Sequence, residues 1–401
     1  MVANPSKSYL QRAIICAAIA KEKTHFLIDN PSDDVAAALR LLPALGASFQ
    51  NGIIHPSSST SRLDELVLSV GESGLLLRLM STIGLGFAKR LILKGEGTLL
   101  KRSIVSLVDQ LQAIGLQVES NNGFLPVVIE GEITNASLSV NASDSSQFLS
   151  GLLISLSQRP FDSVVKVTAL SSMPYIDLTL DVLKDFGVRV RHEDYNIFYI
   201  NGNQMMSPQK NSIEGDWSGA ANHLVGAAIS GEITMKGLSI ISTQADKSIL
   251  NALVDFGAMV EVHEHEIKVQ QNEKRPFVFD ATHCPDLFPP LAILACAAVG
   301  TSEIIGLHRL VNKESNRQLS IVNMLNVLGV NYRIVADSIF IEGKGKVHGG
   351  TIATYNDHRM SMAGAIAACI ASSEIIIDNI TCVAKSYPNF FNDLKELSVS
   401  V

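Results

Sequence analysis

The chain has 401 residues, of which 47% are hydrophobic and 18% charged, and its formal net charge is −7. The length predicts two or three domains, and the negative charge argues against broad binding to nucleic acid, which needs a basic face. No apolar run approaches the roughly 18–20 residues of a membrane span, and residues 1–12 show no secretory signal. We therefore expect a cytoplasmic protein with neither nucleic-acid nor membrane partners. The five cysteines form no C-x-x-C pair, which argues against a zinc site or a disulfide framework.

A pattern of about 70 residues recurs from one end of the chain to the other. In each copy an apolar helix ends in glycine and a short alternating strand follows, as in "LLPALGASF" and "DVLKDFGVRV". Glycine is expected there because it enters the left-handed conformation that ends a helix without steric cost. The glycines are Gly46, Gly115, Gly187, Gly257 and Gly329, and a sixth, degenerate copy reads "DLKELSVSV".

Each copy contains a second helix whose start is polar and whose body is apolar all round. In chain order the openings lie at Ser8, Gly74, Ser146, Ser218, Asp286 and His358. Such bodies predict buried helices, and β-branched segments such as "VVKVTAL", "ITMKGLSI" and "SEIIIDNI" predict strands between them. We expect an α/β fold of two similar domains, residues 6–213 and 214–401, with residues 1–5 at the crossover. Each domain has three β-α-β-α-β-β units around buried parallel helices.

Cations gather near these helix starts, although the chain is acidic overall. Buried helix N-termini offer unpaired N–H donors and partial positive charge, so they favour anions. Charged residues near the starts are Lys7, Arg12, Arg78, Asp357 and Arg359, while Arg102, Lys313, Arg317 and Lys385 lie in loops. Any one of them alone is more often solvated surface, and Glu314 could simply pair with Lys313 or Arg317. Their recurrence in phase predicts a small ligand with several negative charges.

Ten segments of the chain then resemble, in order, the motifs of one enzyme family. They are "SKSYLQRA", "GESGLLLR", "LKRSIVSLVDQL", "SDSSQFLSGLL", "SSMPYIDLTLDVL", "EGDWSGAA", "PDLFPPLAILA", "NKESNRQ", "YNDHRM" and "AKSYPNFF". The family is the 5-enolpyruvylshikimate-3-phosphate synthases, and the resemblance covers nearly the whole chain. It implies two domains that close over the substrates, and transfer of the enolpyruvyl group of phosphoenolpyruvate to the 5-hydroxyl of shikimate 3-phosphate. It implies no metal and no organic cofactor, and we expect a monomer.

The resemblance also implies roles for individual residues. Shikimate 3-phosphate would contact Ser8, Arg12, Ser145, Ser146, Ser172, Tyr175 and Lys313. Phosphoenolpyruvate would contact Lys7, Gly74, Arg102, Arg317, Arg359 and Lys385, with Gln147 touching both substrates. Asp286 would accept the proton of the 5-hydroxyl and Glu314 would protonate the methylene carbon, a division that needs two carboxyls in opposite protonation states. Lys7, His358 and Lys385 would steady the developing charge.

The sequence departs from the family pattern at a few positions. Leu75 and Leu79 stand where a threonine and a proline are usual, Met173 replaces a common lysine, and Asn316 replaces a frequent aspartate. Two other interpretations remain open: a sibling transferase acting on UDP-N-acetylglucosamine, and a catalytically dead anion-binding module. The sibling's reactive loop cysteine has no evident counterpart after Gly115, and the dead module would not need the acids Asp286 and Glu314.

Only five residues precede Ser6, where the family usually has a strand of about a dozen residues. We therefore expect Met1–Asn4 to add no strand to the second domain, and the sixth unit to keep an open sheet edge there.

Overall fold

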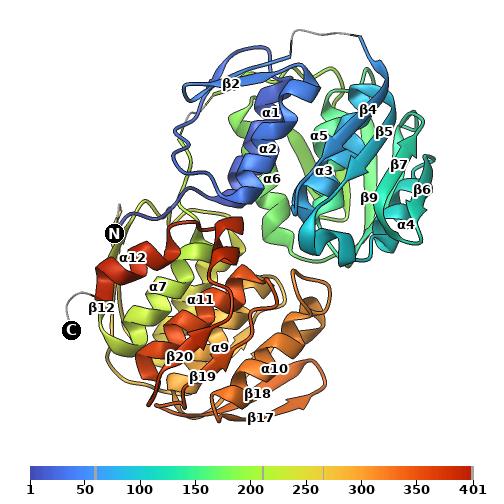
Figure 1. Cartoon of the computed structure of the whole chain (residues 1–401). Helices are drawn as coiled ribbons and strands as arrows, with labels where there is room; N and C mark the ends of the chain where they lie inside the picture. Colours follow the sequence, from blue (N-terminus) through green and yellow to red (C-terminus); the bar gives the residue numbers. More distant parts are fainter. Residues whose placement is uncertain (58–60, 210–211, 265, 399–401) are drawn as a thin grey trace. The chain divides into compact units, whose positions relative to one another are not determined.

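The computed structural model describes residues 1–57, 61–209, 212–264 and 266–398. It divides into two compact units (Figure 1), which we call the N-terminal unit, Lys7–Ile213, and the C-terminal unit, Met1–Ser6 with Glu214–Val401. Ser6, placed by the sequence in the first domain, is grouped with the C-terminal unit. No described helix is long and apolar enough to cross a membrane.

The N-terminal unit contains six α-helices and three sheets among its described residues. The helices are α1 (Lys7–Ile19), α2 (Asp33–Leu41), α3 (Gly74–Ile83), α4 (Val105–Ala113), α5 (Gln147–Ser157) and α6 (Met173–Asp185). The first sheet has the order β1 (Thr24–His25), β3 (Ile53–His55), β2 (Ser48–Gln50). The second has the order β4 (Leu63–Ser69), β5 (Ala88–Lys94), β7 (Phe124–Glu130), β6 (Gln117–Asn121). The third has the order β10 (Val190–Glu193), β11 (Ile197–Ile200), β9 (Ser163–Leu170), β8 (Ser137–Ala142).

The C-terminal unit is built in the same way. Its helices are α7 (Trp217–Ser230), α8 (Ile249–Phe256), α9 (Phe288–Ala297), α10 (Arg317–Val327), α11 (His358–Ala367) and α12 (Phe390–Ser398). One sheet has the order β12 (Glu232–Lys236), β14 (Glu266–Gln270), β13 (Met259–Val262). Another has the order β15 (Val278–Asp280), β16 (Val299–Ile305), β18 (Ser338–Lys344), β17 (Asn331–Val335), and β19 (Gly350–Ile352) pairs with β20 (Ile375–Ile377).

The strand order confirms the predicted β-α-β-α-β-β unit. In four of the described sheets, the first two strands of a repeat pair in parallel across an intervening helix, as β4 pairs with β5. The last two strands form an antiparallel hairpin, and its second strand joins the second strand of the unit, as β7 joins β5. A parallel pair needs a crossover connection, and the apolar helix supplies it. Residues 399–401 of the degenerate sixth copy lie outside the described residues.

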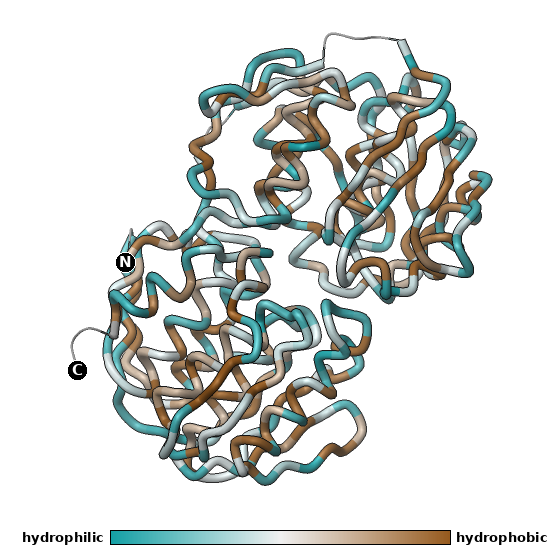
Figure 2. The backbone as a smooth tube through the Cα atoms, viewed as in Figure 1, coloured by the Kyte–Doolittle hydropathy of each residue, from teal (hydrophilic) through white to brown (hydrophobic). Residues whose placement is uncertain are grey.

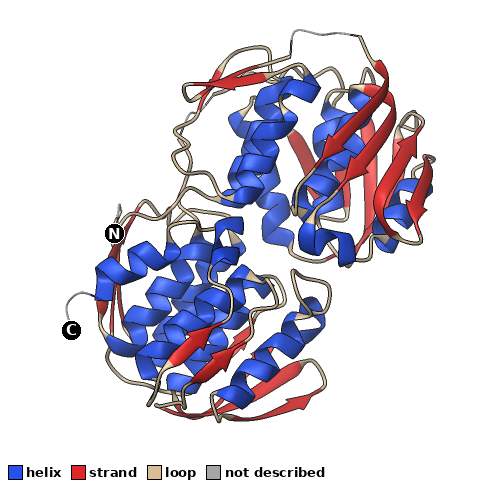
Figure 3. Ribbon diagram, viewed as in Figure 1, coloured by secondary structure: helices blue, strands red, loops and turns tan. Residues whose placement is uncertain are grey.

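The buried helices form the centre of each unit, as Figure 3 shows, with strands toward its margins. Every residue of α9 and α11 is buried, and Figure 2 shows brown, hydrophobic stretches along such central segments. These helices start within two residues of the predicted positions; α3 begins at Gly74 and α11 at His358. The predicted glycine stops are also confirmed, because all five take positive φ, from 68° at Gly329 to 99° at Gly257.

The expectation that Met1–Asn4 add no strand to the second domain is confirmed, because no strand is assigned to these described residues, but they still bond to the C-terminal unit. The amide N–H of Ala3 donates to the Lys236 carbonyl at 2.9 Å, the Lys236 N–H donates to the Met1 carbonyl at 2.9 Å, and the Met1 amino group donates to the Thr234 carbonyl at 3.0 Å. Val2 thus forms a parallel bridge with the end of β12 rather than a long regular strand. In the fourth repeat of the chain, this segment lies where the first strand of the β-α-β-α-β-β pattern is expected. It covers an edge of the sheet of the fourth repeat rather than of the sixth.

The close packing of α3 on α5 generates a stability prediction. A Cβ placed on Gly151 of α5 would lie 2.8 Å from both the Arg78 carbonyl oxygen and the Leu79 Cα atom of α3. Because these are backbone atoms, they cannot turn aside. We expect Gly151→Ala to lower the free energy of unfolding by about 1–3 kcal/mol, as other overpacked cores do, when measured by urea denaturation.

The matched control is Gly86→Ala, which makes the same chemical change in the same unit but in open space. It should change the free energy of unfolding by less than about 1 kcal/mol. Equal effects of the two substitutions would contradict the packing argument.

Candidate functional site

In the N-terminal unit, the first turn of α1 is tied to α2. Lys7 donates from Nζ to Asp34 Oδ2 at 3.0 Å, and Gln11 donates from Nε2 to the Asp34 carbonyl at 2.8 Å and to Ser73 Oγ at 2.9 Å. Ser73 in turn caps α3, because its hydroxyl accepts from the amide of Leu76 at 3.2 Å. The starts of three helices are therefore fixed relative to one another, and the Lys7 ammonium is held among them.

Arg12 is almost fully buried and joins α1 to α6. Its Nε donates to Thr179 Oγ1 and its Nη1 to the Ser8 carbonyl, both at 2.8 Å, while Nη2 donates to the Tyr175 carbonyl at 3.4 Å. Burial lowers the pKa of Arg12 to about 10, which leaves the guanidinium charged at neutral pH. The structure thus brings together three of the residues that the sequence assigned to shikimate 3-phosphate.

Two arginines flank the start of α3. A Cβ on Gly74 would lie 3.0 Å from Arg102 Nη1 and 3.3 Å from Arg78 Nη1, so both guanidinium groups reach the bare backbone there. Burial first, and then the charge of Arg102, lowers the pKa of Arg78 to about 10. Two like charges beside a helix N-terminus favour an anion. The sequence noted Arg78 as a cation near this start but left it out of the binding set; its position one turn after Gly74 was the available signal.

The serine positions lie at the starts of α5 and α6. Ser146 is buried and is the residue before α5, and the Ser145 hydroxyl accepts from the amide of Gln147 at 3.2 Å. Ser172 precedes α6 with φ of 55°, in the left-handed region that costs a serine conformational energy. Leu75 and Leu79 are buried in the core, and α3 keeps a regular capped start despite them.

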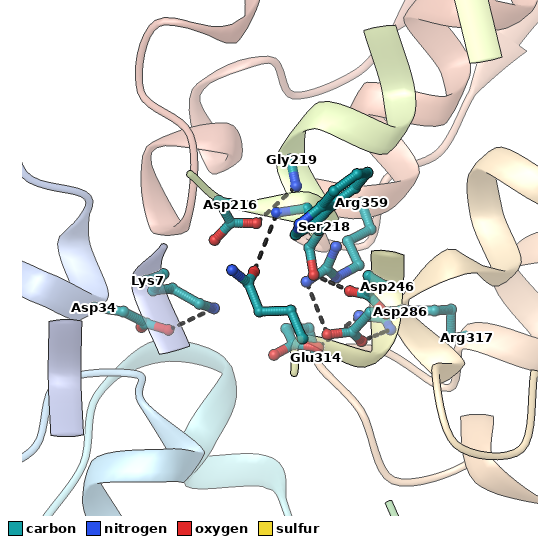
Figure 4. Close-up of polar contacts among 12 residues, drawn as sticks. Lys7, Asp34, Asp216, Ser218, Gly219, Asp246, Asp286, Glu314, Arg317 and Arg359 are labelled. Atoms are coloured by element: carbon teal, nitrogen blue, oxygen red, sulfur yellow. Dashed lines mark hydrogen bonds and ion pairs between the residues drawn. The ribbon is translucent and has the colours of Figure 1, made fainter. Parts of the chain in front are cut away.

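In the C-terminal unit, Arg317 is fully buried and bonds to three carboxylates, two of which, Asp286 and Glu314, are drawn in Figure 4. Its Nη1 donates to Asp286 Oδ1 at 2.8 Å, its Nη2 to Glu314 Oε2 at 2.6 Å, and its Nε to Asp357 Oδ2 at 2.9 Å. The three negative charges raise the pKa of Arg317 even though burial alone would lower it. The side chain therefore acts as the fixed centre of an acidic group.

Asp286 receives a second arginine from α11. Arg359 Nη2 donates to Asp286 Oδ2 at 2.8 Å. Burial alone would raise the pKa of Asp286, but the charges of Arg359, Lys313 and Arg317 outweigh it and hold that pKa well below its usual range. Conversely, burial lowers the pKa of Lys313 to about 8, with Asp286 opposing the shift.

The remaining predicted residues lie at the ends of helices. Asp357 is fully buried and caps α11, accepting from the amide of Arg359 at 3.0 Å. His358 is the first residue of α11, and Lys385 ends the short 3₁₀ helix η8 (Thr381–Lys385); both are buried. Asn316 caps α10 by accepting from the amide of Leu319 at 3.3 Å, so this departure keeps a capping role.

One buried acid was missed by the sequence reasoning. Asp246 lies in the short 3₁₀ helix η4 (Ala245–Ser248), is 1% exposed, and accepts from the Ser218 hydroxyl. Figure 4 places it beside Asp286 and Arg359. Its segment "STQADKS" carries no motif that the sequence analysis used, so only the fold shows that it belongs here.

These features define a class of protein: a repeat α/β enzyme in which arginines, lysines and paired acids surround the starts of buried helices, ready for anionic small molecules. The family model for EPSP synthase (3-phosphoshikimate 1-carboxyvinyltransferase) matches residues 1–394.

Relatives and solved structures agree with the family match. The 3-phosphoshikimate 1-carboxyvinyltransferase of Clostridium acetobutylicum is 35% identical over 405 aligned residues, covering 99% of this chain and 94% of the relative. That of Methanocorpusculum labreanum is 32% identical and covers 100% and 96%. The structure of EPSP synthase from Acinetobacter baumannii superposes with a TM-score of 0.78 at 25% identity, covering 99% and 94%. The chain belongs to the EPSP synthase family, whose members act on small-molecule substrates.

The buried arginine generates a prediction for the C-terminal unit. We expect Arg317→Ala to lower the free energy of unfolding by about 3–5 kcal/mol, because it removes the shared charged donor of three carboxylates, of which Asp357 is fully buried. Arg275→Ala removes an arginine from an exposed pair with Glu273 in the same unit and should cost less than about 1 kcal/mol. Chemical denaturation of both variants measures the contrast.

The difference in the free energy of unfolding between the wild type and Arg317→Ala should also depend on pH. Because the folded-state pKa of Asp286 is lowered, its stabilising contribution is present above its unfolded pKa of about 3.9 and is lost as the pH falls. The gap between the wild type and Arg317→Ala should therefore narrow in acid. A gap as small as that of Arg275→Ala at neutral pH would show that Arg317 is not the centre of the acidic group.

Proposed function

We propose that this chain transfers the enolpyruvyl group of phosphoenolpyruvate to the 5-hydroxyl of shikimate 3-phosphate and releases inorganic phosphate. The observation that carries the proposal is the family match over residues 1–394, and the charged groups around Arg317 and Gly74 support it. The reaction is the 3-phosphoshikimate 1-carboxyvinyltransferase step of aromatic amino-acid biosynthesis.

The chemistry proceeds by addition and elimination. The 5-hydroxyl oxygen bonds to C2 of phosphoenolpyruvate while C3 takes up a proton and becomes a methyl group. Phosphate then leaves C2, and the methyl group returns a proton, which restores the double bond. We assign Asp286 as the base that receives the hydroxyl proton and Glu314 as the acid that protonates C3 and takes the proton back. Lys7, His358 and Lys385 steady the charges on the tetrahedral intermediate and the leaving phosphate.

The electrostatics of Asp286 suggest how substrate binding prepares the base. In the structure its pKa lies well below its usual range because Arg359, Lys313 and Arg317 surround it, and such a carboxylate is a weak base. A phosphate or carboxylate of a substrate would share Arg359 and Lys313 and offset part of their charge. The pKa of Asp286 would then rise toward the range in which a base is effective. The base is thus strengthened by the anions on which it acts.

The binding residues divide into two sets. We assign shikimate 3-phosphate to Ser8, Arg12, Ser145, Ser146, Ser172, Tyr175 and Lys313. We assign phosphoenolpyruvate to Lys7, Gly74, Arg102, Arg317, Arg359 and Lys385, with Gln147 reaching both. Because Arg317 already donates to three carboxylates, its larger part is to orient Asp286 and Glu314.

One assay tests the function. Phosphate release from phosphoenolpyruvate is measured with shikimate 3-phosphate or with UDP-N-acetylglucosamine as the acceptor. The proposal requires release with the first acceptor only. Release with the sugar nucleotide alone would make the chain the sibling transferase, and release with neither would leave an anion-binding protein without this activity.

The two acids generate a kinetic prediction. Asp286→Asn and Glu314→Gln should each lower kcat by about 10²–10⁴-fold, the usual scale for a positioned proton-transfer group, while KM changes far less. The controls are Asp255→Asn and Glu273→Gln, the same changes at exposed positions of the same unit. Near-normal turnover in either test variant would remove that residue from the mechanism.

Gly74 generates a prediction on inhibition. Family membership implies that glyphosate competes with phosphoenolpyruvate, and a methyl group on Gly74 would press on Arg102 at 3.0 Å. We expect Gly74→Ala to weaken glyphosate inhibition about 10-fold or more, equivalent to at least about 1.4 kcal/mol. Gly86→Ala, in open space, is the control. Unaltered glyphosate inhibition in Gly74→Ala would exclude the start of α3 from this pocket.

A further inference from the structure

The mechanism above leaves one buried acid without a role. Asp246 is 1% exposed in η4 and lies beside Asp286 and Arg359 in Figure 4. It lies 40 positions before Asp286 in the chain, so only the fold brings the two carboxyls together. An acid buried next to another acid normally costs stability unless its charge is compensated or removed.

The hydrogen bonds of Asp246 fit a neutral carboxyl better than an ionised one. Its Oδ2 accepts from the Ser218 hydroxyl. Its Oδ1 is buried and has no hydrogen-bond partner within residues 1–57, 61–209, 212–264 and 266–398. An ionised carboxylate has about four acceptor sites to satisfy, whereas a protonated one has fewer and carries a donor of its own. One hydroxyl is too little for a buried negative charge.

The charged groups around Asp246 also favour its neutral form. Asp286 faces it from the 3₁₀ helix η5 (Pro285–Leu287), Asp216 from the start of α7, and Arg359 from α11; the Cys284 thiol is also close. Burial first, and then the charge of Asp286, raises the pKa of Asp246 to about 7, and Arg359 and Ser218 only partly oppose this. Arg359 instead donates its Nη2 to Asp286 at 2.8 Å.

We propose that Asp246 is a positioning residue that works in its neutral form and leaves the Arg359 guanidinium to Asp286 and to an arriving anion. The proposal rests on the proposed function, since it concerns the same reaction. Ionisation of Asp246 would pull Arg359 away from Asp286 and place a second negative charge where a phosphate or carboxylate must bind. When Asp246 is neutral, the two acids have different roles. Asp286 stays ionised as the base, and Asp246 stays neutral so that the Arg359 guanidinium remains available to Asp286.

The first test measures stability and does not depend on activity. A group whose folded-state pKa is raised contributes stability below its unfolded pKa, and this is lost as the pH rises through the folded pKa. The wild type should lose that contribution between about pH 4 and pH 8, whereas Asp246→Asn cannot ionise. The melting temperature of Asp246→Asn relative to the wild type should therefore rise by about 3 °C or more from pH 5 to pH 8.5.

The control for this test is Asp255→Asn, the same change at an exposed position of the same unit, which should show no such trend. A difference between Asp246→Asn and the wild type that does not vary with pH would overturn the proposal. If Asp246→Asn does not fold, the infrared carbonyl band of a protonated carboxyl in the wild type decides instead. It must be present near pH 6 and lost near pH 8.5, and its absence at both would overturn the proposal.

The second test measures catalysis. The ratio of kcat/KM for Asp246→Asn to that of the wild type, with phosphoenolpyruvate as the varied substrate, should rise about 10-fold between pH 6 and pH 8.5, as expected for one added charge. Taking the ratio cancels the titration of the substrates. Asp246→Ala has no side-chain amide to accept the hydrogen bond from Ser218. Its kcat/KM should therefore be lower than that of Asp246→Asn at both pH values. A loss of about 100-fold or more in Asp246→Asn at pH 6 would mean that Asp246 must be ionised. If the wild type releases no phosphate, the proposed function fails, and the stability test still decides the state of Asp246.

Discussion

The C-terminal unit depends on one buried cation, Arg317, and on the three carboxylates that it holds. A buried guanidinium is tolerated only when its donors are satisfied by acids with good geometry. Arg317 meets this condition with Asp286, Glu314 and Asp357. The same contacts fix the two acids that we assign to proton transfer, and they fix the residue that caps α11. The proposed chemistry is therefore coupled to stability at this point, since the interaction that makes burial tolerable also orients the acids that we assign to proton transfer.

The buried helices explain why anions are favoured although the chain is acidic. A helix that is apolar all round must be enclosed, and its first N–H groups then need partners that solvent cannot supply. Capping side chains such as Ser73 and Asp357 satisfy some of them. Around the start of α3, Arg78 and Arg102 add positive charge to that of the helix. The repeat that builds the core thus also gathers N–H donors and positive charge that favour anions locally, although the net charge is −7.

Small differences between the neighbours of Asp286 and those of Asp246 favour opposite protonation states of the two acids. Asp286 and Asp246 lie close together, yet Arg359 and Arg317 donate to the first, while a single serine hydroxyl donates to the second. Charged donors stabilise the ionised form of one acid, and burial without them favours the neutral form of the other. Substrate anions would alter this balance because they would share the arginines.

The sequence by itself determined the features that repeat locally. Apolar periodicity, polar helix starts and glycine stops are properties of short segments, so the starts of α3 and α11 and the left-handed Gly257 could be predicted, and the motifs identified the family. It did not predict that Val2 pairs with β12, because backbone hydrogen bonds leave no side-chain pattern. Nor did it show that Arg317 would hold Asp357 or that Asp246 would lie beside Asp286. Those contacts join residues about 40 positions apart, and only the packing of separate helices and loops within the C-terminal unit brings such residues together.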